Sequence, residues 1–322
     1  MAASRNKLPL DLTQRVGNFL VDHLADSQSL HVGLSGGLDS VVLLHVLAHI
    51  APVPVRAIHV HHGLSPNADH WTAFCQDFCA DLRVDLSICR VAVDASAGIG
   101  LEAAARNARY AAFASLPVEC LFLAQHRGDQ AETVLHNLLR GAGVLGLAGM
   151  PAARYRGPLK ILRPLLSTGR EEIAVYARQA GLRWIEDESN ADCRLTRNFI
   201  RHEVLPPLYR RFPQGERALA AAASHLAEAA ELLDALAQAD WQALAVDGAL
   251  PMRRVRTLDA PRLKNLLRWR LRRLGWQAPV ASRLDEFARQ LLSAGADRHP
   301  ALDLPQGRLF VAAGALHLAA GK

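Results

Sequence analysis

Short apolar runs alternate with amphipathic segments of helical length through the first half of the chain. Four runs rich in Val, Leu and Ile predict β-strands, over residues 30–34, 53–60, 84–93 and 119–124. Helical spacing of apolar residues predicts helices over 40–49, 68–82, 101–116, 129–140 and 170–180. Strands that alternate with helices in this way favour an α/β fold with a doubly wound, mostly parallel sheet.

A different pattern begins after Pro213. An Ala/Leu/Glu-rich run from Glu216 to about residue 246 predicts one long helix without strand signals, and a second helix is expected between Asp259 and Gly275. Residues 301–320 predict short strands around Gly-containing turns. We therefore expect a larger α/β domain over residues 1–215 and a smaller, mainly helical domain over 216–322 with short strands at its end.

The composition is that of an ordinary folded protein. The chain has 322 residues, of which 50% are hydrophobic and 21% charged, which excludes disorder and fits about two domains. The longest apolar stretch, residues 41–55, is interrupted by His and Pro, so no membrane span is predicted. The N-terminal segment lacks the apolar core of a secretion signal, and the five cysteines include no C-x-x-C pair. These features predict a cytoplasmic protein without a disulfide framework or a common zinc or iron–sulfur site.

The net charge of +6 is concentrated in one segment of the second domain. One face of the helix after Asp259 is apolar, with Leu263, Leu266, Leu267, Leu271 and Leu274. The opposite face and the segment before it are basic, with Arg253, Arg254, Arg256, Arg262, Lys264, Arg268, Arg270, Arg272 and Arg273. Such a face is suited to contacts with nucleic-acid phosphates, although a solvated charged surface has the same pattern.

The most informative residues follow the first predicted strand and open a helix: Ser35, Gly36, Gly37, Leu38, Asp39 and Ser40. A helix N-terminus offers free backbone N–H groups and the positive end of the helix dipole, glycines allow an anion to approach closely, and serines add donors. The segment therefore predicts a phosphate-binding loop. Asp39 repels phosphate, so its presence indicates a Mg²⁺ ion between them. A tight turn with Ser40 or Asp39 as the helix N-cap is the alternative.

Three other motifs in the sequence have the pattern of a site. Residues 33–37 fit the G-x-S-x-G elbow of a serine hydrolase with Ser35 as nucleophile, but that fold places several strands before the elbow. The G-x-G-x-x-G at residues 141–146 follows a helix rather than a strand, so a dinucleotide site is not expected there. His59, His61 and His62 do not share one strand face and have no acid or Cys to complete a metal site.

With this loop, the chain resembles the PP-loop (N-type) ATP pyrophosphatases, which cleave ATP between the α and β phosphates. Four further segments narrow the resemblance to the tRNA(Ile)-lysidine synthetase family. They are residues 59–64, residues 101–106 with Arg109 and Tyr110, residues 129–133 with Arg140 and Gly141, and residues 184–190 with Arg197, Asn198 and Arg201. They follow the family's order over about the first two thirds of the chain.

The resemblance implies an enzyme that adenylates the wobble cytidine of an isoleucine tRNA with a CAU anticodon and attaches lysine to C2 of that base, releasing AMP and pyrophosphate. Its cofactors would be ATP and Mg²⁺, and its partners that tRNA and free lysine, with a homodimer left open. Residues 1–215 would be the PP-loop catalytic domain and residues 216–322 the tRNA-binding domain, with the last domain of longer members reduced or absent.

The resemblance also assigns roles to individual residues. It implies ATP binding by Ser35, Gly36, Gly37, Leu38, Asp39, Ser40, His59 and Arg106. It implies catalytic roles for Asp39, Asp129, Glu132 and Arg197, with Asp39 and Asp129 as the metal ligands. It implies tRNA contacts by Arg109, Asn198 and Arg201, to which the basic helix adds Arg268, Arg272 and Arg273.

Helical spacing supports two of these assignments. Asp129 and Glu132 share one face of a helix start, where they would receive a lysine ammonium or, for Asp129, a metal, although acids in a first turn also suit the helix dipole. Arg106 and Arg109 lie one helical step apart and suit a phosphate, although a salt bridge with Glu102 is the alternative.

The chain departs from the family pattern at four positions, with His61, Ser65, Gln125 and Gly128 where the family commonly has Asn, Arg, His and an acid. We expect from the loss of the second acid that Asp129 is indispensable, and that Gly128→Asp is tolerated.

A PP-loop tRNA thiolase is the nearest alternative function, although Cys75 and Cys79, four apart on a predicted helix, are poorly placed for a cluster. A hydrolase acting through Ser35 and a catalytically inactive tRNA-binding protein are two further functions compatible with these motifs.

Overall fold

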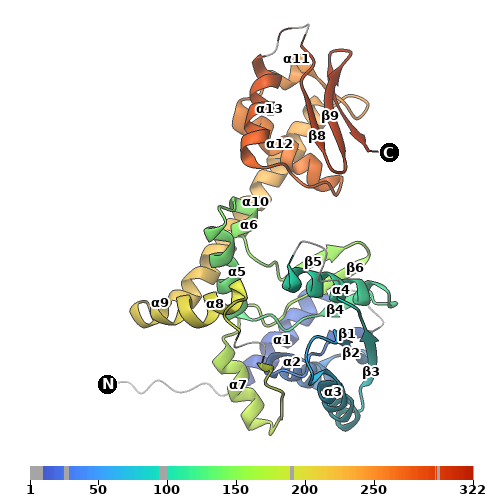
Figure 1. Cartoon of the computed structure of the whole chain (residues 1–322), viewed down its shortest axis with the longest axis vertical. Helices are drawn as coiled ribbons and strands as arrows, with labels where there is room; N and C mark the ends of the chain where they lie inside the picture. Colours follow the sequence, from blue (N-terminus) through green and yellow to red (C-terminus); the bar gives the residue numbers. More distant parts are fainter. Residues whose placement is uncertain are drawn as a thin grey trace. The chain divides into compact units, whose positions relative to one another are not determined.

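The computed structural model describes residues 10–24, 29–93, 100–188, 192–293, 295 and 298–321. The chain forms two compact units, Met1–Ala227 and Glu228–Lys322 (Figure 1). The division between them falls inside one long helix, α10 (Gly215–Leu244).

The first unit is built on a six-stranded sheet in the order β3-β2-β1-β4-β6-β5. All neighbouring strands are parallel except β5 and β6, so the predicted doubly wound, mostly parallel sheet is confirmed. The strands are β1 (Leu30–Gly33), β2 (Val55–His61), β3 (Asp85–Arg90), β4 (Cys120–Phe122), β5 (Ala153–Arg156) and β6 (Leu159–Leu162). The β5–β6 hairpin was not predicted, because its strands are short and β5 is mostly polar.

Helices flank this sheet and extend the unit. They are α1 (Leu10–His23), α2 (Leu38–Ile50), α3 (Ala68–Leu82), α4 (Leu101–Ala114), α5 (Arg127–Leu139), α6 (Val144–Leu147), α7 (Arg170–Gln179), α8 (Thr196–Phe199) and α9 (Leu205–Arg211), with a π-helical turn η2 (Ile200–Val204) between the last two. The predicted range 68–82 matches α3, whereas the predicted helix at 129–140 begins two residues earlier, at Arg127.

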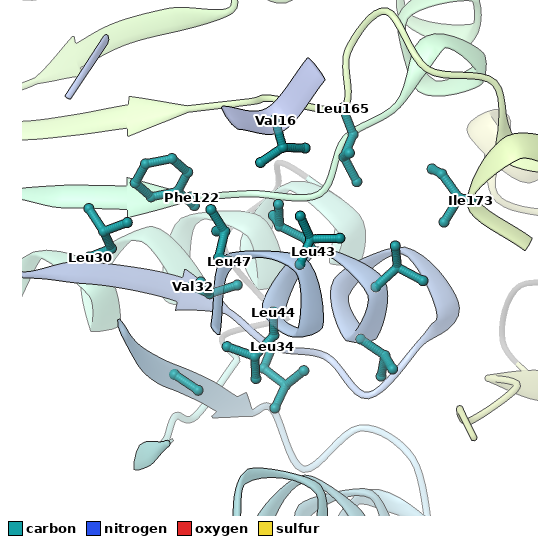
Figure 2. Packing of buried hydrophobic residues seen from close by; sticks show 14 of the residues in the cluster. Val16, Leu30, Val32, Leu34, Leu43, Leu44, Leu47, Phe122, Leu165 and Ile173 are labelled. Carbon is teal, nitrogen blue, oxygen red and sulfur yellow. The ribbon is translucent and has the colours of Figure 1, made fainter. Parts of the chain in front are cut away.

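The strands bury residues on both faces of the sheet. Leu30, Val32 and Phe122 point into a cluster that also contains residues of α1, α2 and α7 (Figure 2). Leu121 and Ile161 point to the opposite face, against α4. This alternation follows from the two-residue period of a β-strand. Helix α2 is buried along most of its length, so its N-terminus is held firmly at the end of β1.

The second unit packs helices against a four-stranded antiparallel sheet in the order β7-β10-β9-β8. Its elements after α10 are β7 (Leu250–Pro251), α11 (Met252–Val255), α12 (Ala260–Arg273), α13 (Ala281–Ser293), β8 (Ala301–Leu304), β9 (Gly307–Ala312) and β10 (Ala315–Ala320). Four of the five predicted apolar-face leucines of α12 are buried, but Leu274 is 38% exposed because it lies just beyond the end of the helix. Helix α13 was not predicted.

Among the helices of the described residues, none combines the length and the apolar character that crossing a membrane requires.

Candidate active site

The loop between β1 and α2 is held in shape by its two serines. The Ser40 hydroxyl accepts a hydrogen bond from the Ser35 backbone N–H (3.1 Å) and donates one to the Gly37 carbonyl (2.9 Å). Because Ser40 has only one hydroxyl proton, the Ser35 hydroxyl is the donor in the 3.0 Å contact between the two Oγ atoms. Gly36 has φ of +87°, and a Cβ there would lie 2.9 Å from Cδ1 of Ile185, so this position requires glycine.

The start of α2 leaves its first N–H groups available to a ligand. The N-cap residue is Gly37, and it makes no side-chain cap hydrogen bond. Asp39 and Ser40 therefore lie inside the first turn, and neither caps the helix as the tight-turn interpretation required. Free N–H groups at the positive end of a buried helix form an anion site.

The geometry gives no support to a serine hydrolase. In the described part of the chain, the Ser35 hydroxyl contacts Ser40 and, at 3.4 Å, the Gly37 N–H. A nucleophilic serine requires a base within hydrogen-bond reach. The buried His59 instead uses its Nδ1 on the Leu34 carbonyl (2.9 Å), where it fixes the backbone just before the loop. Burial lowers the pKa of His59, so its ring is neutral at pH 7.

Asp39 directs its carboxylate toward the start of α5, the helix that follows β4. Its Oδ2 lies 3.8 Å from Nε2 of His126, while its Oδ1 is buried without a hydrogen-bond partner among the described residues. Burial raises the pKa of Asp39, and the nearby charge of Asp129 raises it further. A buried carboxylate oxygen without a partner is a position where a cation is stabilised.

His126 lies between Asp39 and Asp129. Its Nδ1 accepts a hydrogen bond from the Gly128 N–H (3.0 Å), which leaves Nε2 as the ring nitrogen that can donate. That Nε2 lies 3.8 Å from Asp39 and 3.7 Å from Asp129. Asp129 in turn accepts a hydrogen bond from the His126 backbone N–H (3.0 Å), so the pair forms a capping box at the helix start.

The acids of α5 are held by one arginine from the π-helical turn. Arg201 donates to both carboxylate oxygens of Glu132, at 2.5 and 2.9 Å, and to Oδ1 of Asp129 at 2.9 Å. Glu132 is 4% exposed; its burial raises its pKa, and Arg201 counteracts part of that rise. The structure thus places Arg201, predicted from the resemblance to contact tRNA, directly on the two acids predicted to bind a cation.

The other predicted residues lie around this centre with varied partners. Arg197 forms an ion pair with Glu102 (3.2 Å), which replaces the alternative pairing of Glu102 with Arg106 or Arg109. The buried Asn198 donates to the Asp192 carbonyl (3.1 Å). Burial lowers the pKa of Arg109, which has the charges of Arg106 and Arg197 nearby.

Sequence reasoning missed the role of His126 and the close approach of residue 128 to its ring. A Cβ at position 128 would lie 2.7 Å from Cε1 of His126, so a side chain there requires the His126 ring to shift. The expectation that Gly128→Asp is tolerated stays a prediction, and it requires the His126 ring to move. Gln125, the neighbouring departure, accepts a hydrogen bond from Nε of the buried Arg163 (3.0 Å). The signal for His126 was its place directly after a buried strand, at the same sheet edge as the loop.

Cys75 and Cys79 of α3, which the sequence placed four residues apart, are not in the reactive thiolate form. Burial raises the pKa of Cys75 to about 12 and that of Cys79 to about 11, so both are protonated thiols at pH 7. In the part of the chain that the structure describes, no group of three or more His, Cys, Asp or Glu side chains is arranged to bind a metal ion. Mg²⁺ needs only one or two carboxylates besides phosphates and water, and Asp39 with Asp129 fit that requirement.

In the second unit, much of the basic face of α12 has partners within the unit. Arg262 pairs with Asp240 (2.5 Å), Lys264 with Asp285 (2.7 Å) and Arg272 with Asp234. The Arg270 guanidinium lies 4.2 Å from the centre of the Trp241 ring. Arg268 and Arg273 make no hydrogen bond or ion pair within the described residues, so they are the arginines of α12 that remain available for a ligand.

Comparison with known proteins agrees with this geometry. A model of the PP-loop domain matches residues 9–208, and a model of the TilS substrate binding domain matches residues 250–317. The first unit is thus a PP-loop ATPase domain. The structure of the U34-tRNA thiolase NcsA from Methanococcus maripaludis, with its [4Fe-4S] cluster, is similar in fold, with a TM-score of 0.57 at 18% identity over 68% of this chain and 79% of that one.

Sequence relatives define the family more narrowly. The chain is 46% identical to the tRNA(Ile)-lysidine synthase of Chromobacterium violaceum, over 90% of this chain and 69% of that protein. It is 42% identical to the tRNA(Ile)-lysidine synthase of Nitrosomonas europaea, over 93% of this chain and 67% of that protein. The chain belongs to the tRNA(Ile)-lysidine synthase family, whose members are ATP-dependent, tRNA-modifying enzymes. It spans about two thirds of the length of these relatives.

Proposed function

We propose that the protein converts the wobble cytidine of a CAU-anticodon isoleucine tRNA to lysidine, using ATP and free lysine. The observation that carries this proposal is the convergence of Asp39, Asp129 and Glu132 beside the loop of Ser35 to Ser40, in a chain of this family. One site thereby joins an anion-binding helix start to carboxylates suited to cations. Adenylation followed by attack of an amine needs both.

In the first step, the loop would hold the phosphates of ATP through the N–H groups at the start of α2 and the Ser35 and Ser40 hydroxyls. Asp39 and Asp129 would hold Mg²⁺, which neutralises charge on the departing pyrophosphate. The cytidine O2 attacks the α-phosphorus, pyrophosphate leaves, and the base becomes adenylated. Arg106 would contact the nucleotide, and His59 would act by positioning the loop rather than by touching ATP.

In the second step, the ε-nitrogen of lysine attacks C2 of the base, and AMP leaves with the former O2. The attacking amine must first lose a proton from its ammonium form. Glu132 is suited to accept that proton, because burial raises the pKa of its carboxyl group. Lysine would compete with Arg201 for the acids, since an ammonium and a guanidinium make the same charge-assisted hydrogen bonds. Arg197 would act on the adenylated base.

The tRNA would contact Arg109 and Asn198 in the first unit and Arg268 and Arg273 in the second. Residues 1–215 are proposed as the catalytic domain and 216–322 as a tRNA-binding domain. The enzyme would act in the cytoplasm with its substrates, and sedimentation would test whether it forms a homodimer.

The test is mass spectrometry of the wobble cytidine in a CAU-anticodon transcript after incubation with ATP, Mg²⁺ and lysine. We expect the mass gain of lysine minus water at that nucleotide, with AMP and pyrophosphate as products. A transcript with U at the wobble position is the matched control and should remain unmodified. Release of ADP as the main product, or an unmodified cytidine, would refute the proposal.

A further inference from the structure

Five arginines surround one buried tyrosine on the α4 face of the sheet. The Arg106 guanidinium lies 5.3 Å from the centre of the Tyr110 ring, and that of Arg156 lies 4.7 Å from it. Burial by itself raises the pKa of Tyr110, but the charges of Arg106, Arg163, Arg109 and Arg154 lower it overall. The electrostatic influence on this hydroxyl is thus strongly positive.

Two of these arginines lie on the edge strand β5 and share its face toward α4. Arg154 pairs in register with Ile161, and Arg156 pairs with Leu159. Directly paired residues of neighbouring strands project from the same face of the sheet. Leu159 and Ile161 pack in one cluster with Tyr110 and Phe113 of α4, so Arg154 and Arg156 project along that helix. Figure 1 shows α4 beside β5 and β6.

Acidic residues that would neutralise these arginines are missing from the segments that carry them. Residues 103–118 and 133–170 contain no Asp or Glu. Within the described residues, Arg106, Arg154 and Arg156 form no ion pair, and Arg154 and Arg156 are exposed. Like charges held close together repel one another, so an anion that lies across them is stabilised.

The arginines follow α4 from the end of β2 towards the edge strand β5. Arg109 is close enough to His62, which follows β2, for its charge to add to burial in lowering the pKa of that histidine. Arg106 lies one helical turn before Tyr110 on α4, and β5 is the outermost strand on that side of the sheet. An extended polyanion fits a line of this kind better than a compact triphosphate, which the loop at β1 already accommodates.

We propose that Arg154 and Arg156, which project along α4 and which we call the α4–β5 arginine cluster, bind the phosphate backbone of the tRNA. The proposal rests on the proposed function in taking tRNA as the RNA. Arginine suits this task because its planar guanidinium stays charged and donates two parallel hydrogen bonds to a phosphate. Such contacts set the position and affinity of the RNA without reading its sequence.

The test compares two double variants of equal charge change. Arg154→Gln with Arg156→Gln removes the charge of the cluster, and Arg178→Gln with Arg183→Gln removes two exposed arginines from α7 and the segment after it. Helix α7 packs on the opposite face of the sheet from α4. Binding of the CAU-anticodon transcript is measured by filter retention over a range of salt concentrations, and binding of ATP by equilibrium dialysis.

We expect the α4–β5 variant to bind the transcript roughly tenfold more weakly near physiological salt, with a salt dependence reduced by about one ion per lost contact. ATP binding should stay unchanged, and the α7 variant should bind RNA within about twofold of the parent. Arg156→Lys with Arg154→Lys should recover part of the affinity, because the charge returns without the planar fork. If the double variant has a lower melting temperature than the parent, the single variant Arg154→Gln replaces it in the binding assay, because Arg154 is not stacked on Tyr110.

Three results would overturn the inference. Unchanged RNA affinity and salt dependence would mean that the cluster is only solvated, and equal losses in both variants would mean a general charge effect. Weaker ATP binding with intact RNA binding would assign the cluster to a free nucleotide. If the parent protein forms no lysidine while the α4–β5 variant still loses RNA affinity, the proposed function fails and the inference stands.

Discussion

Arg201 and Glu132, 69 residues apart in the sequence, form a two-point ion pair in which Nε–Oε1 is 2.5 Å and Nη2–Oε2 is 2.9 Å. Glu132 is almost fully buried, whereas about a third of the Arg201 side chain is exposed. The pair therefore has one partner fixed in the protein interior and one that is open to displacement from solvent.

Removal of Arg201 should destabilise the protein in a pH-dependent way. Arg201→Ala leaves a buried carboxyl whose pKa is already raised by burial, and it removes the charge that counteracts this rise. A raised pKa in the folded state means that stability is present at low pH and lost as the pH rises through that pKa. We expect a loss of about 2 kcal/mol at pH 8 and much less at pH 5, measured by urea unfolding. Equal losses at both pH values would contradict this account.

Asp39→Asn should stabilise the protein while it abolishes activity. Burial raises the pKa of Asp39, so its ionised form weakens the folded state above that pKa, and the neutral amide removes this cost. We expect the free energy of unfolding to rise by about 1 kcal/mol at pH 8, with little change near pH 4. Asp77→Asn, at an exposed position of α3, is the control. A loss of stability at pH 8 would indicate that Asp39 has a favourable partner.

Asp129 caps the start of α5 and also supplies a negative charge to the site, and two variants separate these roles. Asp129→Asn keeps an oxygen that accepts the His126 N–H, whereas Asp129→Ala loses both the cap and the charge. We expect lysine transfer to be abolished in both, but a loss of about 1 kcal/mol of stability only in Asp129→Ala. Glu132→Gln should raise the KM for lysine and should also lower kcat, because an amide cannot accept the proton of the attacking amine. Near-normal turnover of Asp129→Asn at limiting Mg²⁺ and lysine would leave only the capping role.

Gly128 should tolerate no side chain while His126 keeps its place. Gly128→Ala puts a Cβ 2.7 Å from the His126 ring and should shift the imidazole away from Asp39 and Asp129, with a loss of activity of at least about tenfold. Gly143→Ala is the matched control, because its Cβ would meet no atom within 4 Å. Activity assays and melting curves of both variants test this, and equal activity would show that the ring is free to move.

The arginines of α12 should divide into two groups. Arg272→Ala removes the ion pair with Asp234 and should lower the melting temperature with little effect on tRNA affinity. Arg268→Ala with Arg273→Ala should leave the melting temperature unchanged and weaken tRNA binding, with a flatter salt dependence. A tRNA affinity that falls only in Arg272→Ala would reverse this assignment.

Local patterns predicted the elements that depend on neighbours in the sequence. The range of α3, the buried leucines of α12 and the strand-to-helix loop at Ser35 all follow from spacing or from a short motif. The partner of Arg201 was not predictable, because it depends on how η2 packs against α5. The ion pairs of α12 with α10 were not predictable for the same reason, because nothing in the sequence distinguishes Asp234 and Asp240 from solvated surface acids.

The direction of the Arg201 side chain depends on the number of residues in the π-helical turn η2. A π-turn holds one residue more than the α-helical turn it replaces. Each residue of an α-helix advances the side chain by about 100° around the axis, so deletion of one residue between Phe199 and Arg201 would restore α-helical winding and turn position 201 away from Glu132. An insertion or deletion in this turn would therefore remove the positive charge beside Asp129 and Glu132, although no residue that contacts these acids is substituted.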